Sequence, residues 1–169
     1  EQFLYGLSPE ILGHVVEVIS GMSLDEYFNI NIFDPIGMED TYFSLPESKQ
    51  DRLVPVYSHD ENGNLFTFPP QSLSWIGADK WLQEPDKVHH YSGGGDLSST
   101  VIDYAKFSQM LLNGGSYNGH QILNHRTIGM MVADQGINPR CYYFVDCPGG
   151  TQQNVTPGST FNLGFGLVL

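Results

Sequence analysis

The chain has 169 residues, of which 19 are acidic and 7 are basic, and its formal net charge is −12. A chain of about 150 residues can bury about 70% of its unfolded surface, so one domain with its own core is expected. The apolar fraction of 40% excludes a disordered chain, and the acidic balance without any basic run excludes a protein that reads a phosphate backbone. No nucleic-acid partner is therefore expected.

The first predicted element is a helix that begins at Ser8 and Pro9, because serine caps free amides and proline suits the first helical position. Gly21 is expected to end it. Its apolar positions, which recur at helical spacing, are Ile11, Leu12, Val15, Val16, Val18 and Ile19. A second helix is predicted to begin at a capping box of Ser23 and Glu26 and to end before Pro35. Together the two helices form a hairpin that must pack on a larger body.

Residues 53–57 and 65–68 are predicted to be strands on either side of Asn62-Gly63, a dipeptide typical of β-hairpin turns. Acidic and amide side chains at alternate positions from Asp60 also resemble the start of a calcium loop. That loop would need a glycine at its sixth position and a glutamate at its twelfth, and both are missing. We therefore predict a hairpin, with a calcium site as the minor alternative.

A third helix is predicted after the glycine-rich residues 93–95, with Thr100 as its cap and residues 113–115 (NGG) at its end. Its expected apolar positions are Val101, Tyr104, Ala105, Phe107, Met110 and Leu111. A fourth helix is predicted across residues 126–132, and a strand across residues 161–169.

No apolar run approaches the roughly 18 residues of a membrane span, and no secretory signal precedes the first predicted helix. The sequence begins and ends abruptly, which favours a piece of a longer protein. Cys141 and Cys147 either form a local disulfide or remain ordinary thiols, and Asn154 begins a triplet that fits a glycosylation site. A periplasmic or secreted location is favoured.

No complete catalytic set is present in the chain. The patterns S-x-x-K, G-x-S-x-G and H-E-x-x-H are all absent, and so is a phosphate-binding loop. His89 and His90 are adjacent and cannot converge on one metal ion, so ordinary loop histidines are favoured over a metal site. The glycines at 93–95 form either a permissive bend or a close backbone approach to a ligand.

Tyr5 is the candidate catalytic residue, because it stands just before a helix whose start holds its neighbours in place. A tyrosine hydroxyl has a pKa of about 10, which a nearby ammonium group can lower until the hydroxyl carries protons. From spacing alone, the alternative is an aromatic ring that packs before the helix.

Four segments, in order, resemble the serine β-lactamase-related family, which holds class C β-lactamases, DD-peptidases and related esterases. They are residues 5–13 (YGLSPEILG), 32–41 (IFDPIGMEDT), 92–100 (SGGGDLSST) followed by Asp103, Tyr104 and Phe107, and 111–115 (LLNGG) followed by Gly119. Residues 164–166 fit the strand that comes next in the family. Asp96 stands where the family usually has glycine or another small residue.

The resemblance implies an α+β fold: a mainly helical subdomain of the β-lactamase/transpeptidase-like fold, with a small β-hairpin and edges of the parent sheet. Residues 1–169 would form a single partial domain. The resemblance also implies a serine hydrolase that acts through an acyl-enzyme on a small-molecule acyl substrate, with no metal or other cofactor. The nucleophilic serine, its lysine and the K-T-G or H-x-G strand would lie outside this chain, so the chain alone would be inactive.

Within the resemblance, Tyr5 falls on the tyrosine of the family's Y-x-N motif, and Leu7 replaces the asparagine. That replacement removes a polar contact to a substrate amide, which favours an ester over a β-lactam or a peptidoglycan amide. Leu7, Gly94 and Gly95 are the expected substrate-binding residues. The alternative is a non-catalytic binding or scaffold protein with the same fold.

Overall fold

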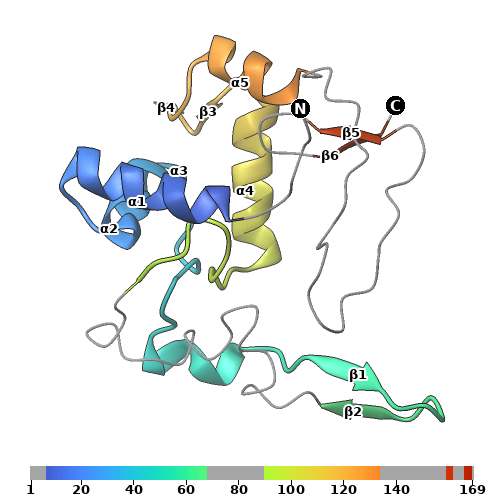
Figure 1. The fold of residues 1–169 in the computed structure, drawn as a ribbon. Helices are drawn as coiled ribbons and strands as arrows, with labels where there is room; N and C mark the ends of the chain where they lie inside the picture. The colour runs from blue at the N-terminus through green and yellow to red at the C-terminus, as the bar shows by residue number, and fades with distance from the viewer. Residues whose placement is uncertain (1–6, 68–89, 134–158, 162–165, 169) are drawn as a thin grey trace.

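The computed structural model describes residues 7–67, 90–133, 159–161 and 166–168. Within these ranges it contains helices and three small antiparallel strand pairs (Figure 1). Tyr5, both cysteines and the Asn154 triplet lie outside the described residues. None of the described helices is long and apolar enough to cross a membrane.

Helix α1 (Ser8–Ser20) begins at the predicted place but without a serine cap. Leu7 is the N-cap residue, and its carbonyl oxygen accepts hydrogen bonds from the backbone amides of Glu10 and Ile11 at 3.1 and 3.3 Å. The prediction that Ser8 caps the helix is therefore wrong, because Ser8 is already helical. The helix ends as predicted at Gly21, whose φ of 70° lies in the left-handed region.

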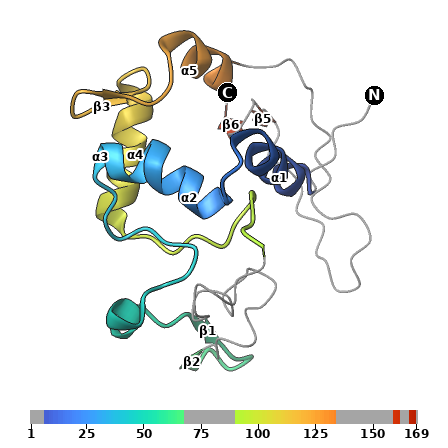
Figure 2. The same cartoon turned by 90° about the vertical axis from the view of Figure 1, so that its left-hand side faces the viewer.

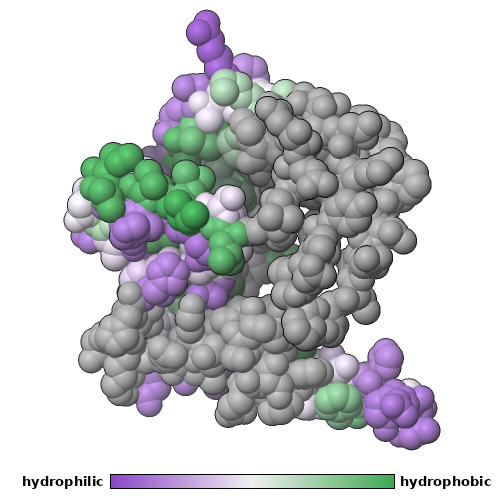
Figure 3. Space-filling view, viewed as in Figure 1, coloured by the Kyte–Doolittle hydropathy of each residue, from purple (hydrophilic) through white to green (hydrophobic). Residues whose placement is uncertain are grey.

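The predicted apolar stripe of α1 does not form the core of the described part of the chain. Only Gly13 of this helix is buried, and Figure 3 shows apolar surface over α1. The exposed side chains of this face are Ile11, Leu12, Val15, Val18 and Ile19, at 42–81%. The buried apolar side chains belong to other segments: Leu24, Phe33, Ile36, Met38, Phe43, Leu45, Met110 and Ile128.

The second helical run consists of α2 (Leu24–Phe28), one π-helical turn η1 (Asn29–Phe33) and α3 (Asp34–Ile36). Its predicted cap is confirmed, because the Ser23 hydroxyl accepts a hydrogen bond from the Glu26 amide at 3.2 Å. Figure 2 shows this run crossing α4.

The prediction that this run ends before Pro35 is wrong, since it continues to Ile36 and ends at Gly37, where φ is 74°. The π-helical turn gives the physical reason. The Asp34 amide reaches back to the Asn29 carbonyl, so Pro35 stands in the first turn of a new helical segment, where no amide donor is needed.

The predicted hairpin is confirmed, with β1 (Tyr57–His59) antiparallel to β2 (Leu65–Thr67). Its first strand is shorter than predicted and begins at Tyr57 rather than Leu53. The Asp60 carboxylate organises the turn, since its two oxygens accept the backbone amide and the side-chain amide of Asn64 at 2.8 and 2.9 Å. These contacts explain the acidic and amide residues as turn chemistry.

Helix α4 (Val101–Leu112) is confirmed together with its cap, because the Thr100 hydroxyl accepts from the Asp103 amide at 3.2 Å. Its buried face differs from the predicted one. Met110 is 1% exposed, whereas Val101 and Tyr104 are 87% and 63% exposed.

Helix α5 (His125–Val132) is also confirmed, and Asn124 caps it through the Thr127 amide at 2.8 Å. The remaining strand pairs are β3 (Ser116–Tyr117) with β4 (His120–Gln121), and β5 (Ser159–Phe161) with β6 (Gly166–Val168). The single strand predicted over residues 161–169 is thus divided between β5 and β6.

A buried carboxylate joins α4 to the chain that follows α3. Asp103 is 3% exposed, and one of its oxygens accepts from the Asp40 amide at 2.7 Å and from the Thr41 hydroxyl at 3.1 Å. The other oxygen accepts from Lys106 at 3.0 Å. Hydrogen bonds to a charged group are stronger than neutral ones, so this carboxylate fixes the start of α4.

Candidate functional site

The glycine-rich loop, residues 92–95, crosses the first turns of α1 at very short range. A Cβ atom on Gly93 would lie 2.1 Å from the carbonyl oxygen of Pro9 and 3.1 Å from the Cα of Gly13. A Cβ atom on Gly13 would in turn lie 3.0 Å from the Cα of Gly93. Neither residue has a positive φ, so space rather than backbone conformation explains the two glycines. A side chain on Gly93 would collide with the backbone of α1, and one on Gly13 would be tightly crowded.

The carboxylate of Glu10 ties this loop to α1. Its Oε1 accepts from the Ser92 hydroxyl at 2.6 Å and from the Gly94 amide at 3.0 Å. Its Oε2 lies 3.2 Å from Nε2 of His90. Partial burial raises the pKa of Glu10, but hydrogen bonds from Ser92, His90 and Gly94 outweigh burial and leave that pKa below its usual value. The carboxylate is therefore ionised at neutral pH.

The predicted substrate-binding residues lie on both sides of this crossing. Leu7 precedes the first turn of α1, with 76% of its surface exposed. Gly94 and Gly95 are exposed in the loop, and a Cβ atom on Gly94 would lie 3.4 Å from the Cβ of Pro9. The structure thus places Gly94 beside the helix that Leu7 caps. Tyr5, the predicted catalytic residue, falls outside the described residues.

The loop continues into Asp96, whose φ of 66° lies in the left-handed region. Glycine adopts this conformation without cost, and aspartate is among the residues that tolerate it. The backbone conformation therefore suits Asp96, whereas a β-branched or bulky residue would be strained at this position.

The burial and hydrogen bonds of Ser92 are those of a residue that positions the loop and not those of a nucleophile. It is 8% exposed, its hydroxyl donates to Glu10, and its oxygen also accepts from the Gly94 amide at 3.2 Å. An activated serine needs an adjacent base and an open approach. The carboxylate stands between Ser92 and His90, and its lowered pKa makes it a weak base. This cluster therefore holds the loop in place.

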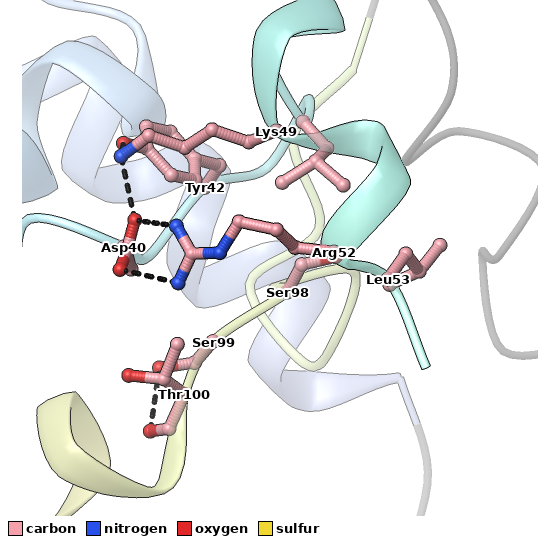
Figure 4. Close-up of a pocket in the computed structure, with 9 residues that line it drawn as sticks. Asp40, Tyr42, Lys49, Arg52, Leu53, Ser98, Ser99 and Thr100 are labelled. Carbon is pink, nitrogen blue, oxygen red and sulfur yellow. Dashed lines mark hydrogen bonds and ion pairs between the residues drawn. The ribbon is translucent and has the colours of Figure 1, made fainter. Parts of the chain in front are cut away.

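A second cluster lines a hollow of about 70 Å³ between Asp40 and the start of α4 (Figure 4). Arg52 donates to both oxygens of Asp40 at 2.9 and 2.8 Å, and Lys49 lies 2.5 Å from one of them. The hydrogen bonds from Arg52 and Lys49 hold the pKa of Asp40 well below its usual range. Both cations already contact Asp40, and the hollow has room for only a few water molecules, so the cluster holds the 3₁₀ helix η2 (Glu47–Arg52) in place.

Within the described part of the chain, no three His, Cys, Asp or Glu side chains gather in a group that could hold a metal ion. His90, predicted to be an ordinary loop histidine, is exposed outside any helix or strand, and its Nε2 contacts the Glu10 carboxylate. Sequence reasoning missed Glu10 because an acidic residue in the first turn of a helix is ordinarily explained by the helix dipole. Its partners lie 80 to 84 residues away along the chain.

Comparisons with known proteins agree with this architecture. A family model described as Beta-lactamase matches residues 7–163. A protein of Escherichia coli (strain K12) named "Putative D-alanyl-D-alanine carboxypeptidase" is 33% identical over 131 residues, which are 72% of this chain and 29% of the relative. The chain thus spans less than a third of that relative's length.

Solved structures show the same fold at lower identity. EstCE1, described as a hydrolase with promiscuous acyltransferase activity, aligns with a TM-score of 0.68 at 20% identity, over 99% of this chain and 41% of its own. The octameric penicillin-binding protein homologue from Pyrococcus abyssi aligns with a TM-score of 0.61 at 21% identity, over 98% of this chain and 30% of its own. The predicted α+β fold of the β-lactamase/transpeptidase type is confirmed.

The close contact between Gly93 and α1 can be tested by the stability of the full-length protein that contains this chain. Gly93→Ala places a methyl group against the backbone of α1, which no rotamer change relieves, so we expect a loss of about 3 kcal/mol in the free energy of unfolding. Gly95→Ala is the matched control, because its Cβ would meet the described part of the chain at no less than 3.8 Å. Urea unfolding of both variants measures the difference, and equal midpoints would contradict the account.

Proposed function

The chain belongs to the beta-lactamase family, and on that premise we propose that it is part of a serine hydrolase that works through an acyl-enzyme. A serine supplied by another part of the protein attacks the acyl carbonyl, the leaving group departs with a proton, and water then hydrolyses the acyl-enzyme. The observation that carries the proposal is the ordered family match over residues 7–163. Residues 1–169 form one partial domain of this enzyme and are inactive alone, because the nucleophile is missing.

Tyr5 is assigned the role of general base or proton relay. It stands two residues before the N-cap of α1, and the first turn of that helix is tied to the glycine-rich loop through Glu10. General acid–base catalysis requires a positioned proton carrier, and the tied first turn of α1 is the described structure that follows Tyr5 in the sequence. The oxyanion is expected to be stabilised by backbone amides.

We favour an ester as the acyl donor, because Leu7 offers no hydrogen bond at the position of the motif's asparagine. A substrate amide would lose a hydrogen-bond partner there, and leaving its polar group unpaired costs binding energy. An ester has no N–H group and avoids this cost. The Escherichia coli relative is named for D-alanyl-D-alanine cleavage. A D-alanyl-D-alanine peptide and a β-lactam are therefore the competing donors in any assay.

The second candidate function is a non-catalytic binding or scaffold role on the same fold. It draws support from the acidic balance of the sequence, 19 acidic against 7 basic residues, which suits a surface that binds a partner. The sequence of the full-length protein discriminates between the two: S-x-x-K ahead of Tyr5 favours the enzyme, and its absence favours the binding role.

Loss of the Tyr5 hydroxyl tests the catalytic assignment. In the full-length protein we expect Tyr5→Phe to lower kcat on a short-chain nitrophenyl ester about 100-fold, the scale of a lost general acid or base. Tyr57→Phe on the exposed hairpin strand β1 is the control and should leave kcat unchanged. Equal rates for wild type and Tyr5→Phe would remove Tyr5 from the mechanism.

A polar side chain at position 7 tests the preference for esters. We expect Leu7→Asn to raise kcat/KM for a β-lactam relative to the nitrophenyl ester about tenfold, the worth of one recovered hydrogen bond. Leu7→Ala serves as the control, because it shortens the side chain without adding a polar group, and it should leave the ratio unchanged. A ratio that does not respond to Leu7→Asn, or that responds equally to both variants, contradicts the assigned role of Leu7.

A further inference from the structure

We propose that Glu10 is a positioning residue for the acyl-transfer reaction: its carboxylate sets where the backbone of Gly94 and Gly95 stands relative to the start of α1. The inference rests on the proposed function, because it concerns the same site.

The contacts of Glu10 all reach one short segment. Its two oxygens contact Ser92, the Gly94 amide and His90 at 2.6, 3.0 and 3.2 Å. Ser92 in turn accepts from the same Gly94 amide. The glycine crossing at Gly93 limits how closely the loop approaches the helix, and Glu10 fixes where along the helix the loop sits.

The position of the loop on α1 matters for the reaction because residues expected to bind the substrate lie in the loop and at the start of the helix. Gly94 and Gly95 are exposed and can meet a substrate, while Leu7 directly precedes the helical turn that carries Glu10. A displacement of about 1 Å between reacting groups can cost about 100-fold in rate. A side chain that fixes the loop on the helix therefore acts on turnover without touching the substrate.

A second glutamate on the same helix allows a positioning role of Glu10 to be distinguished from a purely structural one. Glu17 also accepts a backbone amide at 3.0 Å, from Leu24, but it ties α1 to α2 instead of to the loop. Shortening either side chain by one methylene keeps the charge and withdraws the carboxylate from its partner. Glu10→Asp and Glu17→Asp are therefore the same chemical change at two different joints.

The experiment uses the full-length protein, with turnover of a short-chain nitrophenyl ester, thermal melting, and hydrogen exchange of the peptide that covers residues 90–97. We expect Glu10→Asp to lower kcat by about 10- to 100-fold and to speed exchange in this peptide. Glu17→Asp should lower Tm while kcat stays within about twofold.

Two further variants complete the test. Glu10→Gln keeps the length and an accepting oxygen, so its kcat should stay within about threefold of wild type. Ser92→Ala, which removes one loop contact, should lower kcat in the same direction if Glu10→Asp does not fold.

Three outcomes would overturn the inference. Unchanged kcat in Glu10→Asp, with an active wild type, makes Glu10 a stabilising residue only. An equal fall of kcat in Glu10→Asp and Glu17→Asp assigns the effect to general destabilisation. A wild-type protein that turns over no ester, β-lactam or D-alanyl-D-alanine peptide contradicts the proposed function itself, and that failure is seen before any variant is made.

Discussion

The close crossing of the glycine-rich loop over α1 is the constraint on which the candidate site depends. Gly13 and Gly93 leave no room for a side chain between the two backbones, and the ionised Glu10 then locks the loop through Ser92 and Gly94. Steric contact and a charge-assisted hydrogen bond act at the same joint, so the loop is restrained both in distance and along the helix. The predicted substrate-binding residues stand on either side of this joint.

The rest of the described structure supports the loop from its far end. Tyr42 and Ser98 exchange backbone hydrogen bonds at 2.9 and 2.8 Å, and the buried Asp103 fixes the start of α4 a few residues later. The segment between Gly93 and α4 is therefore held at both ends. Most aliphatic side chains of α1 are exposed, whereas Gly13, Glu10 and Glu17 contact other segments.

Local signals predicted the elements well, and the errors have local as well as long-range causes. The caps at Ser23 and Thr100 and the hairpin turn follow from chemistry within a few residues, and all three are confirmed. Pro35 predicts the end of the second helix, but a π-helical turn, which leaves no pattern in the sequence, lets the run continue to Ile36. Glu10 was missed for a different reason, since its partners lie 80 to 84 residues away and only the folded chain brings them together.

We propose that this chain supplies the proton relay and the positioned loop, while another part of the protein carries the nucleophile. Acylation of the full-length protein by an activated ester or a penicillin, followed by peptide mapping of the adduct, tests this claim most directly. The account predicts one acylated serine, located in an S-x-x-K sequence outside residues 1–169. An adduct on a serine within this chain, Ser92 above all, would contradict it.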